Sequence, residues 1–132
     1  MVWTDPEIAR VGLSETQARA QGVAYEVTRY DLADLDRAIA DGAERGFLKA
    51  LTVPGRDRLL GVAIVGAHAG DMLAPFTLAM RARLGLKTIL GTIHPYPGWG
   101  DAARALAAEW RRAHAPPGAA RLSARVLARM RG

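Results

Sequence analysis

Three side chains that can exchange protons lie close together in a segment rich in proline and glycine. The segment runs from Ile93 to Asp101 and contains His94, Tyr96 and Asp101. An imidazole with a pKa near 6.5 can take up and return a proton at neutral pH, whereas a phenol with a pKa of about 10 stays protonated there. The segment therefore indicates acid–base chemistry, in which Tyr96 is better suited to donate a proton than to accept one.

Each of these side chains also has a structural interpretation. His94 can hydrogen-bond a backbone carbonyl or cap a helix, and Asp101 stands where a helix is expected to begin, a common place for a capping carboxylate. Tyr96 and Trp99 can anchor a subunit contact, because an amphipathic ring buries a large area and keeps one polar atom for pairing. The residues alone leave both roles open.

Several other kinds of reactive site are absent from the sequence. There is no cysteine, which excludes a disulfide, a thiolate metal site and a thiol nucleophile within this chain, so a redox-active disulfide would have to lie elsewhere. His68, His94 and His114 do not have metal-ligand spacing, and no metal site is predicted. His68 is interpreted as a hydrogen-bonding loop residue.

Composition indicates one ordinary domain. Of the 132 residues half are apolar and 23% are charged, which suits a single globular body. The net charge of +5 is partly an effect of the C-terminal end, so we predict no nucleic-acid partner. No apolar run reaches the ~18 residues of a membrane span, and the N-terminus lacks a basic-then-apolar signal, so we expect a cytoplasmic location.

The first half of the chain predicts a short helix followed by strands. Ser14 and Gln17 have the spacing of a capping box, and Gly22 would end that helix. Val23, Tyr25 and Val27 alternate as in a half-buried strand over 23–30, and 31–41 reads as a helical turn or loop with Leu32, Leu35 and Ile39. A hairpin is predicted from the strands 47–53 and 58–65, because Pro54-Gly55-Arg56-Asp57 between them favours a tight turn.

The second half predicts two amphipathic helices on either side of the proline-rich segment. The first carries Leu73, Phe76, Thr77, Met80 and Leu84 at helical spacing and ends at Gly85. Residues 88–92 read as a short approach to the proline-rich segment. The second helix begins at Gly100 or Asp101 and carries an apolar face of Ala103, Leu106, Ala107 and Trp110. The fold class is therefore α+β: a two-layer domain with an antiparallel sheet (meander or hairpin) flanked by helices, plus a C-terminal helical tail.

Four stretches occur in the order in which one protein family shows them. They are 4–15, 46–50, 60–73 and the proline-rich segment 93–101. Together they resemble the C-terminal interface domain of the flavin-dependent pyridine nucleotide–disulfide oxidoreductases, the family of lipoamide dehydrogenase, glutathione reductase and mercuric reductase. The resemblance makes 1–113 a dimerisation domain, 114–120 a linker and 121–132 a basic amphipathic tail.

The resemblance also implies a mechanism divided between two subunits. Upstream domains, which this chain lacks, would bind FAD and a nicotinamide nucleotide and carry a cysteine pair. The interface domain of the other protomer would cover that site and supply an acid–base histidine with a carboxylate partner. Tyr96 stands at the position of that histidine and Asp101 at the position of its partner, while His94 is a candidate replacement base. His94 and Pro95 are assigned to cofactor contact.

A tyrosine at this position looks more like the mercuric reductase branch than lipoamide dehydrogenase. The predicted function is thus the dimerisation and active-site-completing domain of an FAD-dependent, NAD(P)H-linked disulfide oxidoreductase, inactive as an isolated fragment. Its partners would be a second copy of itself and its own upstream domains. The residues predicted to form the dimer interface are Met72, Phe76, Met80, Tyr96 and Trp99.

Two other functions fit the same residues. One is a free-standing homodimeric interaction module without flavin. The other is a basic, tail-anchored adaptor, because Arg121, Arg125 and Arg129 form a row beside an apolar stripe in the tail. Such a helix can contact an anionic membrane surface weakly. A solvated tail without a partner is the alternative.

Overall fold

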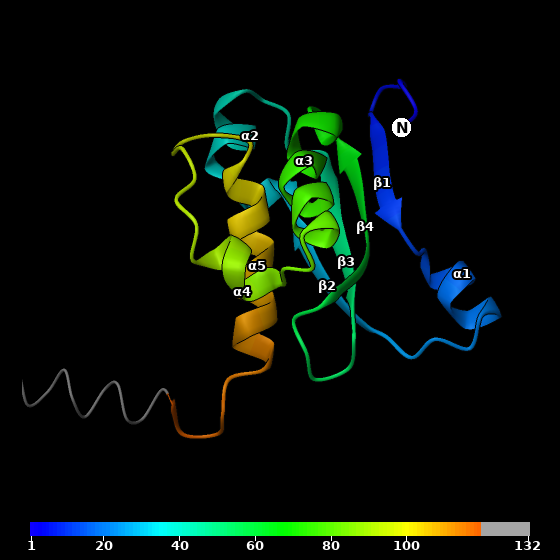
Figure 1. The fold of residues 1–132 in the computed structure, drawn as a ribbon. Coiled ribbons are helices and arrows are strands. Elements are labelled where there is room, and N and C mark those ends of the chain that lie inside the picture. The colour runs from blue at the N-terminus through cyan, green and yellow to red at the C-terminus, as the bar shows by residue number, and fades with distance from the viewer. Residues whose placement is uncertain (120–132) are drawn as a thin grey trace, which may run out of the picture.

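A four-stranded antiparallel sheet forms the centre of the fold (Figure 1). This computed structural model describes residues 1–119, with strands β1 (Ile8–Gly12), β2 (Glu26–Asp31), β3 (Gly46–Thr52) and β4 (Leu59–Gly66). The strand order is β1-β4-β3-β2, so β2, β3 and β4 form a meander and β1 is added at the β4 edge. The predicted α+β class is confirmed, while the predicted tail lies outside the described residues.

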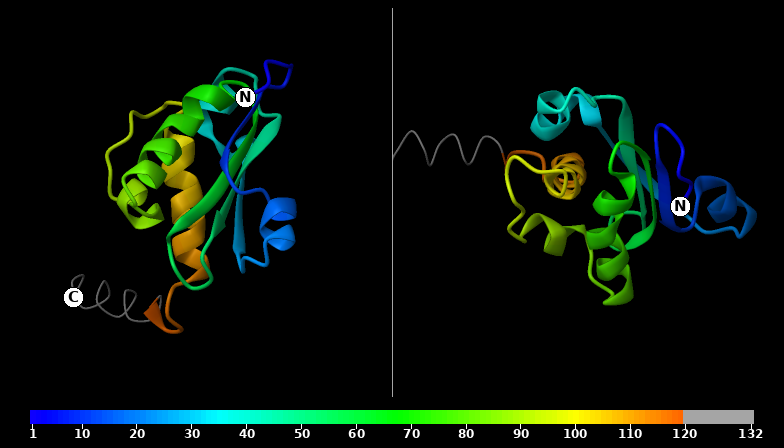
Figure 2. Two further views of the ribbon diagram at one scale, coloured as in Figure 1. Left: turned by 45° about the vertical axis from the view of Figure 1, so that its right-hand side comes forward. Right: turned by 90° about the horizontal axis from the view of Figure 1, so that it is seen from above.

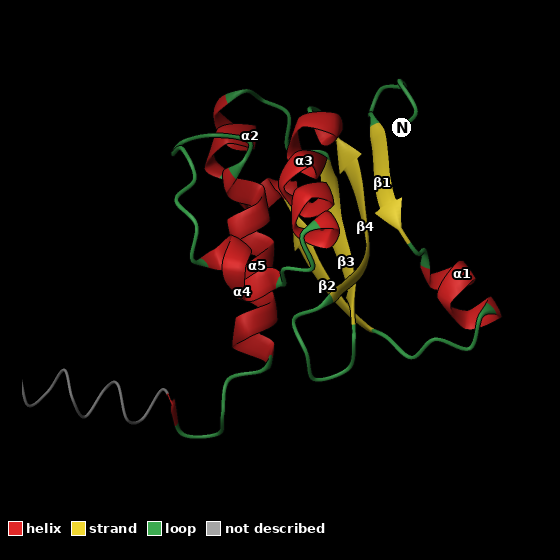
Figure 3. Ribbon diagram, in the orientation of Figure 1, coloured by secondary structure: helices red, strands yellow, loops and turns green. Residues whose placement is uncertain are grey.

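The helices are distributed over both sides of this sheet (Figure 3). In the view from above, α3 and α5 lie on one side of the sheet and α1 lies on the other (Figure 2). Helix α3 packs on β4 and β1, α5 packs on β2 and β3, and α4 packs against α5. The helical elements are α1 (Glu15–Ala20), a 3-10 turn (Leu32–Asp34), α2 (Asp36–Ala40), α3 (Ala69–Arg81), α4 (Leu86–Leu90) and α5 (Asp101–Ala113).

The core lies between the sheet and the α3–α5 layer. Alternate residues of β3 and β4 point into it, as expected where one face of a strand is covered and the period is two. The helices contribute the large side chains that fill the space. The main members are Leu48, Ala50, Val62 and Ile64 from the sheet and Met72, Phe76, Leu86, Leu106 and Trp110 from the helices.

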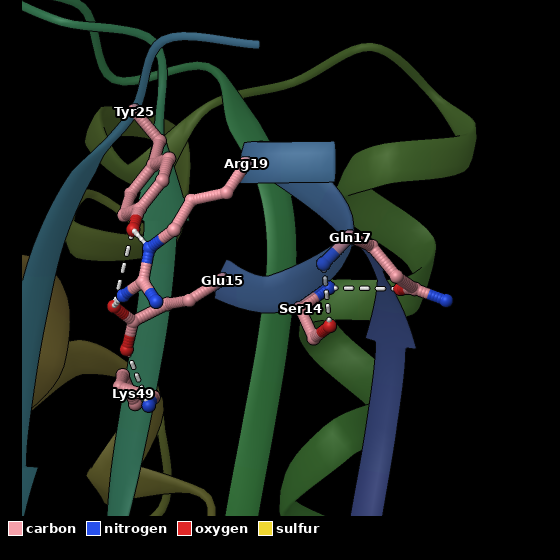
Figure 4. Close-up of polar contacts among 6 residues, drawn as sticks. All are labelled: Ser14, Glu15, Gln17, Arg19, Tyr25 and Lys49. Carbon is pink, nitrogen blue, oxygen red and sulfur yellow. Dashed lines mark hydrogen bonds and ion pairs between the residues drawn. The ribbon is translucent and has the colours of Figure 1, made fainter. Parts of the chain in front are cut away.

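The capping box at the start of α1 is confirmed (Figure 4). The Ser14 hydroxyl accepts a hydrogen bond from the Gln17 amide at 3.2 Å, and the Gln17 side chain accepts one from the Ser14 amide at 3.0 Å. These two bonds satisfy amides that the helix itself leaves unpaired. A six-residue helix is therefore well defined at its first turn.

A polar network fastens α1 to the sheet (Figure 4). The Lys49 ammonium on β3 lies 2.6 Å from Glu15 Oε1, and the Tyr25 hydroxyl donates to Glu15 Oε2 at 3.3 Å. The hydrogen bond from Lys49 lowers the pKa of Glu15. Arg19 donates to the Tyr25 oxygen at 2.9 Å. Helix α1 is thus held to the sheet by polar and charged groups from three segments of the chain.

The predicted phase of β2 is wrong at Val27, whose side chain is 44% exposed. The half-buried residues of the observed strand are Glu26, Thr28 and Tyr30. Thr28 lies opposite Ala50 and Tyr30 lies opposite Leu48 on β3. Paired residues share a face of the sheet, so pairing with these buried residues decides which side of β2 turns inward.

The apolar face of α3 agrees with its prediction only in part. Phe76, one of the predicted residues, is buried, and the other buried residues are Ala69, Met72 and Ala79. Of the remaining predicted residues, Leu73 and Met80 are partly buried, whereas Thr77 and Leu84 are exposed. The helix also ends at Arg81, before the predicted Gly85, and Arg83 takes a left-handed conformation with φ of 57°. Two of the four buried residues, Ala69 and Ala79, are small. A search for large apolar residues does not detect them.

The hairpin and α5 agree with their predictions, but α4 was not predicted. Strands β3 and β4 pair in antiparallel register across the Pro54–Asp57 turn, and α5 begins at Asp101 with the expected buried face. Residues 88–92, interpreted as an approach to the loop, are partly helical because α4 spans Leu86–Leu90. Leu86 and Ile89 anchor this five-residue helix in the core, so packing stabilises a helix too short to form alone.

Candidate functional site: the loop between α4 and α5

The proline-rich segment is a loop that leaves α4, passes near α2 and returns to start α5 (Figure 1). Its tip is exposed, with Ile93 96% and Tyr96 69% accessible. Large apolar and aromatic side chains at such exposure are unusual when they cluster on one loop. The loop nevertheless has specific contacts to the body of the domain, which define the site.

Tyr96 is held by a carboxylate from α2. Its hydroxyl donates a hydrogen bond to Asp36 Oδ2. This hydrogen bond, followed by the charge of Asp36, raises the pKa of Tyr96 above its usual range. The phenol therefore keeps its proton at neutral pH.

Trp99 fastens the other end of the loop to the same region. Its indole Nε1 donates to Asp41 Oδ2 at 3.2 Å, just beyond the C-terminus of α2. Arg37 lies 2.8 Å from the same carboxylate oxygen, and its hydrogen bond lowers the pKa of Asp41. On its other side the indole ring lies 4.8 Å from the His68 ring, centroid to centroid.

Asp101 has a different partner from the one the resemblance implied. It is only 7% exposed, and its two carboxylate oxygens accept from Arg104 at 2.6 and 3.1 Å. This two-point contact within the first turn of α5 raises the pKa of Arg104 and fits the favourable position of an acid at a helix start. The charge of Asp101 contributes to the raised pKa of Tyr96, but the Tyr96 hydroxyl donates its hydrogen bond to Asp36.

His94 is turned toward the helix that precedes it. Its Nε2 lies 3.0 Å from the carbonyl oxygen of Ile89. A carbonyl only accepts, so Nε2 carries the proton of this hydrogen bond. The neighbouring Pro95 is exposed. The contact is one of the structural alternatives, and the role of His94 as an acid–base group stays a prediction.

The residues predicted for the dimer interface fall into two groups. Met72 and Phe76 are completely buried within the protomer's own core, so their side chains do not reach its surface. This differs from the predicted interface because the side of α3 that carries Met72 and Phe76 packs on β4 and β1. Met80 and Trp99 are partly buried against the core, and Tyr96 is exposed.

Sequence reasoning missed two carboxylates, at the start of α2 and just after its end, that organise this loop. Asp36 and Asp41 bind Tyr96 and Trp99 across about 60 positions of sequence. The acidic character of 31–41 was visible, but no local pattern links a carboxylate to an aromatic ring so distant in the chain. The missing signal was the position of α2, which follows from the sheet topology.

Among the described residues, neither the acidic and histidine side chains nor two of the glycines of β4 are placed as in a ligand site. Within residues 1–119 there is no group of three or more His, Cys, Asp or Glu side chains placed to hold a metal. A Cβ at Gly61 would lie 1.9 Å from the Leu13 carbonyl oxygen, and one at Gly66 would lie 2.4 Å from a Leu32 methyl group. These glycines permit close packing within the domain, so they do not fit the phosphates of FAD or NAD(P)H.

No helix within residues 1–119 is long and apolar enough to cross a membrane.

The fold and the loop correspond to a known class of domain. Residues 1–107 match the family described as "Pyridine nucleotide-disulphide oxidoreductase, dimerisation domain". The chain is 38% identical over 104 residues to the mitochondrial dihydrolipoyl dehydrogenase of Caenorhabditis elegans, covering 79% of this chain and 21% of that protein. It is 40% identical over 96 residues to the dihydrolipoyl dehydrogenase of Mycoplasma pneumoniae, covering 73% and 21%.

Solved structures give the same result. The crystal structure of LpdA from Mycobacterium tuberculosis matches with a TM-score of 0.75 and 25% identity, covering 83% of this chain and 24% of that one. The Cu(II) complex of the flavoprotein disulfide reductase RclA from Escherichia coli matches with a TM-score of 0.75 and 27% identity, covering 81% and 24%. The chain belongs to the pyridine nucleotide–disulphide oxidoreductase family and contains its dimerisation domain. It spans 21% of the length of the curated relatives named above.

Proposed function

We propose that this chain is the dimerisation and active-site-completing domain of an FAD-dependent, NAD(P)H-linked disulfide oxidoreductase, inactive as an isolated fragment. The observation that carries the proposal is the loop tip, where Tyr96 is 69% exposed yet fixed by Asp36. A side chain that is oriented by its own protomer and open to solvent is arranged to contact a second body. FAD and NAD(P)H would be bound by upstream domains, consistent with the share of its relatives that the chain covers.

The second body in this proposal is another copy of the chain, and α3 offers a surface for it. The outward side of this helix carries Leu78, which is 68% exposed. A shallow groove of about 520 Å³ runs along the same side and is mainly apolar. Burial of such a groove against its symmetric copy would contribute the apolar area that a dimer requires. The groove is lined by Gly70, Leu73, Ala74, Thr77, Leu78 and Arg81.

The chemistry that the loop supports is proton donation. Tyr96 is protonated at neutral pH as any ordinary phenol is, and Asp36 raises its pKa further. His94 has only Nδ1 left for proton exchange, since its Nε2 is bound to the Ile89 carbonyl. Neither group is hydrogen-bonded to Asp101, which is occupied by Arg104. The loop thus lacks the histidine–carboxylate pair that the family resemblance implied for thiol chemistry.

The choice of branch within the family rests on Tyr96. A tyrosine here supports a mercuric reductase-like branch, whereas the curated relatives named above are dihydrolipoyl dehydrogenases. We retain the mercuric reductase-like branch as the proposal on this residue alone. The final electron acceptor would be determined by residues upstream of this domain.

A chimaera tests the proposal directly. This chain would replace the corresponding domain of the Mycoplasma pneumoniae dihydrolipoyl dehydrogenase, its 40% identical relative. We expect a flavin-containing dimer with little dihydrolipoyl dehydrogenase activity, and Tyr96→His should raise the rate on the order of 10²-fold, the lower range for acid–base catalysis. Tyr96→Phe is the matched control and should not raise it. A flavin-loaded dimer whose activity is left unchanged by Tyr96→His would contradict the proposed role of the loop.

A further inference from the structure

His114 lies at the C-terminal end of α5 and joins segments far apart in the sequence. Its Nε2 is 2.7 Å from Glu26 Oε2 on β2, and its Nδ1 is 2.8 Å from the Trp110 carbonyl oxygen. The other oxygen of Glu26 accepts from the Gly55 amide in the β3–β4 turn at 3.0 Å. One imidazole and one carboxylate therefore connect α5, β2 and this turn.

The partners of the ring determine its protonation. A carbonyl oxygen and an ionised carboxylate oxygen both accept hydrogen bonds and cannot donate them. Each ring nitrogen must then carry a hydrogen, which makes His114 an imidazolium in this geometry. The ring also stacks on the Trp110 indole, with centroids 4.3 Å apart and planes inclined by 19°, so its position is fixed by packing as well as by charge.

Two positively charged side chains near the ring disfavour the imidazolium form of His114. Lys87 on α4 and Arg111 on α5 line the same cavity of about 350 Å³ as His114, and the Lys87 ammonium lies 5.9 Å from the centre of the Trp110 ring. Arg112, the next residue along α5, is paired with Glu109. Glu26 is the carboxylate that contacts the imidazolium directly.

We propose that His114 is a proton-dependent latch that fastens the C-terminal end of α5, and with it residues 115–119, to β2 and the β3–β4 turn. Ala115, Pro116 and Ala119 line the cavity next to the ring, so the latch sets the path by which the chain leaves the domain. The family match ends at residue 107. His114 thus lies beyond the matched region, whereas its partner Glu26 lies within it.

The direction of the pH dependence follows from both partners. The Trp110 carbonyl, and after it Glu26, raises the pKa of His114 above its ordinary 6.5. The contact therefore stabilises the folded chain fully below pH 6.5, and this stabilisation is lost as the pH rises through the raised pKa of His114. The pKa of Glu26 is lowered from 4.5, chiefly by His114, so stabilisation is also lost as the pH falls through that lowered value. The latch is closed between these two limits.

Histidine NMR on the full 132-residue chain tests the latch. Ring ¹⁵N shifts should show both nitrogens of His114 protonated at pH 6.5, and its titration midpoint should lie above the ordinary 6.5, with His114→Gln providing the assignment. Glu26→Gln should move the midpoint of His114 downward. Asp71→Asn is the matched control, because Asp71 faces His68 at 3.4 Å and lies on α3, so the His114 midpoint should not change.

A second measurement separates a latch from a static contact. Amide exchange near His114, whose backbone N–H donates to the Trp110 carbonyl, should accelerate in the wild-type chain as the pH rises through the His114 midpoint, after correction for intrinsic exchange. Glu26→Gln should shift that acceleration to lower pH. A folded chain in which one ring nitrogen is unprotonated at pH 6.5, or in which Glu26→Gln leaves the midpoint unchanged, would overturn the proposal.

Discussion

Tyr96 and Asp101 occupy the positions where the family resemblance placed a histidine and its carboxylate, and each has a partner of its own. Tyr96 is bound by Asp36, whereas Asp101 is bound by Arg104. The catalytic roles of Tyr96 and Asp101 stay predictions. In the proposed function, the exposed loop would act through a protonated phenol.

The Asp36 contact predicts a measurable change in the ionisation of Tyr96. Asp36→Asn removes the negative charge that opposes formation of the phenolate, so the pKa of Tyr96 should fall. Tyrosinate absorbance would be followed against pH, with Tyr96→Phe identifying the contribution of this residue. Asp34→Asn is the matched control, because the charge of Asp34 acts on Tyr30. An unchanged Tyr96 titration in Asp36→Asn would show that the carboxylate does not control the phenol.

At the scale of elements, sequence periodicity predicted most of the layers. The capping box of α1, the β3–β4 hairpin and the start of α5 agree with the structure, because each depends on signals within a few residues. The phase of β2, the buried side of α3 and the existence of α4 depend on what each element packs against. Val27, Met72 and Leu86 illustrate these three cases, and no local pattern distinguishes them.

The same limitation applies to the candidate site. The loop residues were identified because proline, histidine and tyrosine are informative residue types. Asp36 and Asp41 were not identified, since their roles require α2 to lie beside the loop. A site whose groups come from separate elements becomes visible only when the topology brings them together.

The orientation of α3 predicts that two apolar truncations on this helix lower the free energy of unfolding by very different amounts. Phe76→Ala should lower the free energy of unfolding by about 3–5 kcal/mol, because Phe76 is fully buried and its truncation leaves a cavity. Leu78→Ala, with a side chain 68% exposed, should change it by less than about 0.5 kcal/mol. Urea denaturation at a protein concentration where the chain is monomeric would compare them. Similar losses for the two variants would show that α3 is oriented differently.

At the scale of the whole molecule, one sheet face is covered by α3 and α5, and the exposed groups of functional interest lie beyond that layer. These are the outward side of α3 with Leu78 and the loop tip with Ile93 and Tyr96. In the proposed function, these are the surfaces through which the domain would meet another copy of itself and offer its loop to the partner's active site. The chain spans 21% of the length of its dihydrolipoyl dehydrogenase relative, and the cofactor domains of a parent enzyme are part of the same proposal.

Sedimentation equilibrium of the chain tests this arrangement most directly. We expect a reversible dimer that Leu78→Asp converts to a monomer, because a charge would be buried in the apolar groove. Val27→Asp is the matched control, since Val27 is 44% exposed on the edge strand β2, and this variant should remain dimeric. A wild-type chain that stays monomeric at every accessible concentration, or a dimer that Leu78→Asp leaves intact, would contradict self-association through α3.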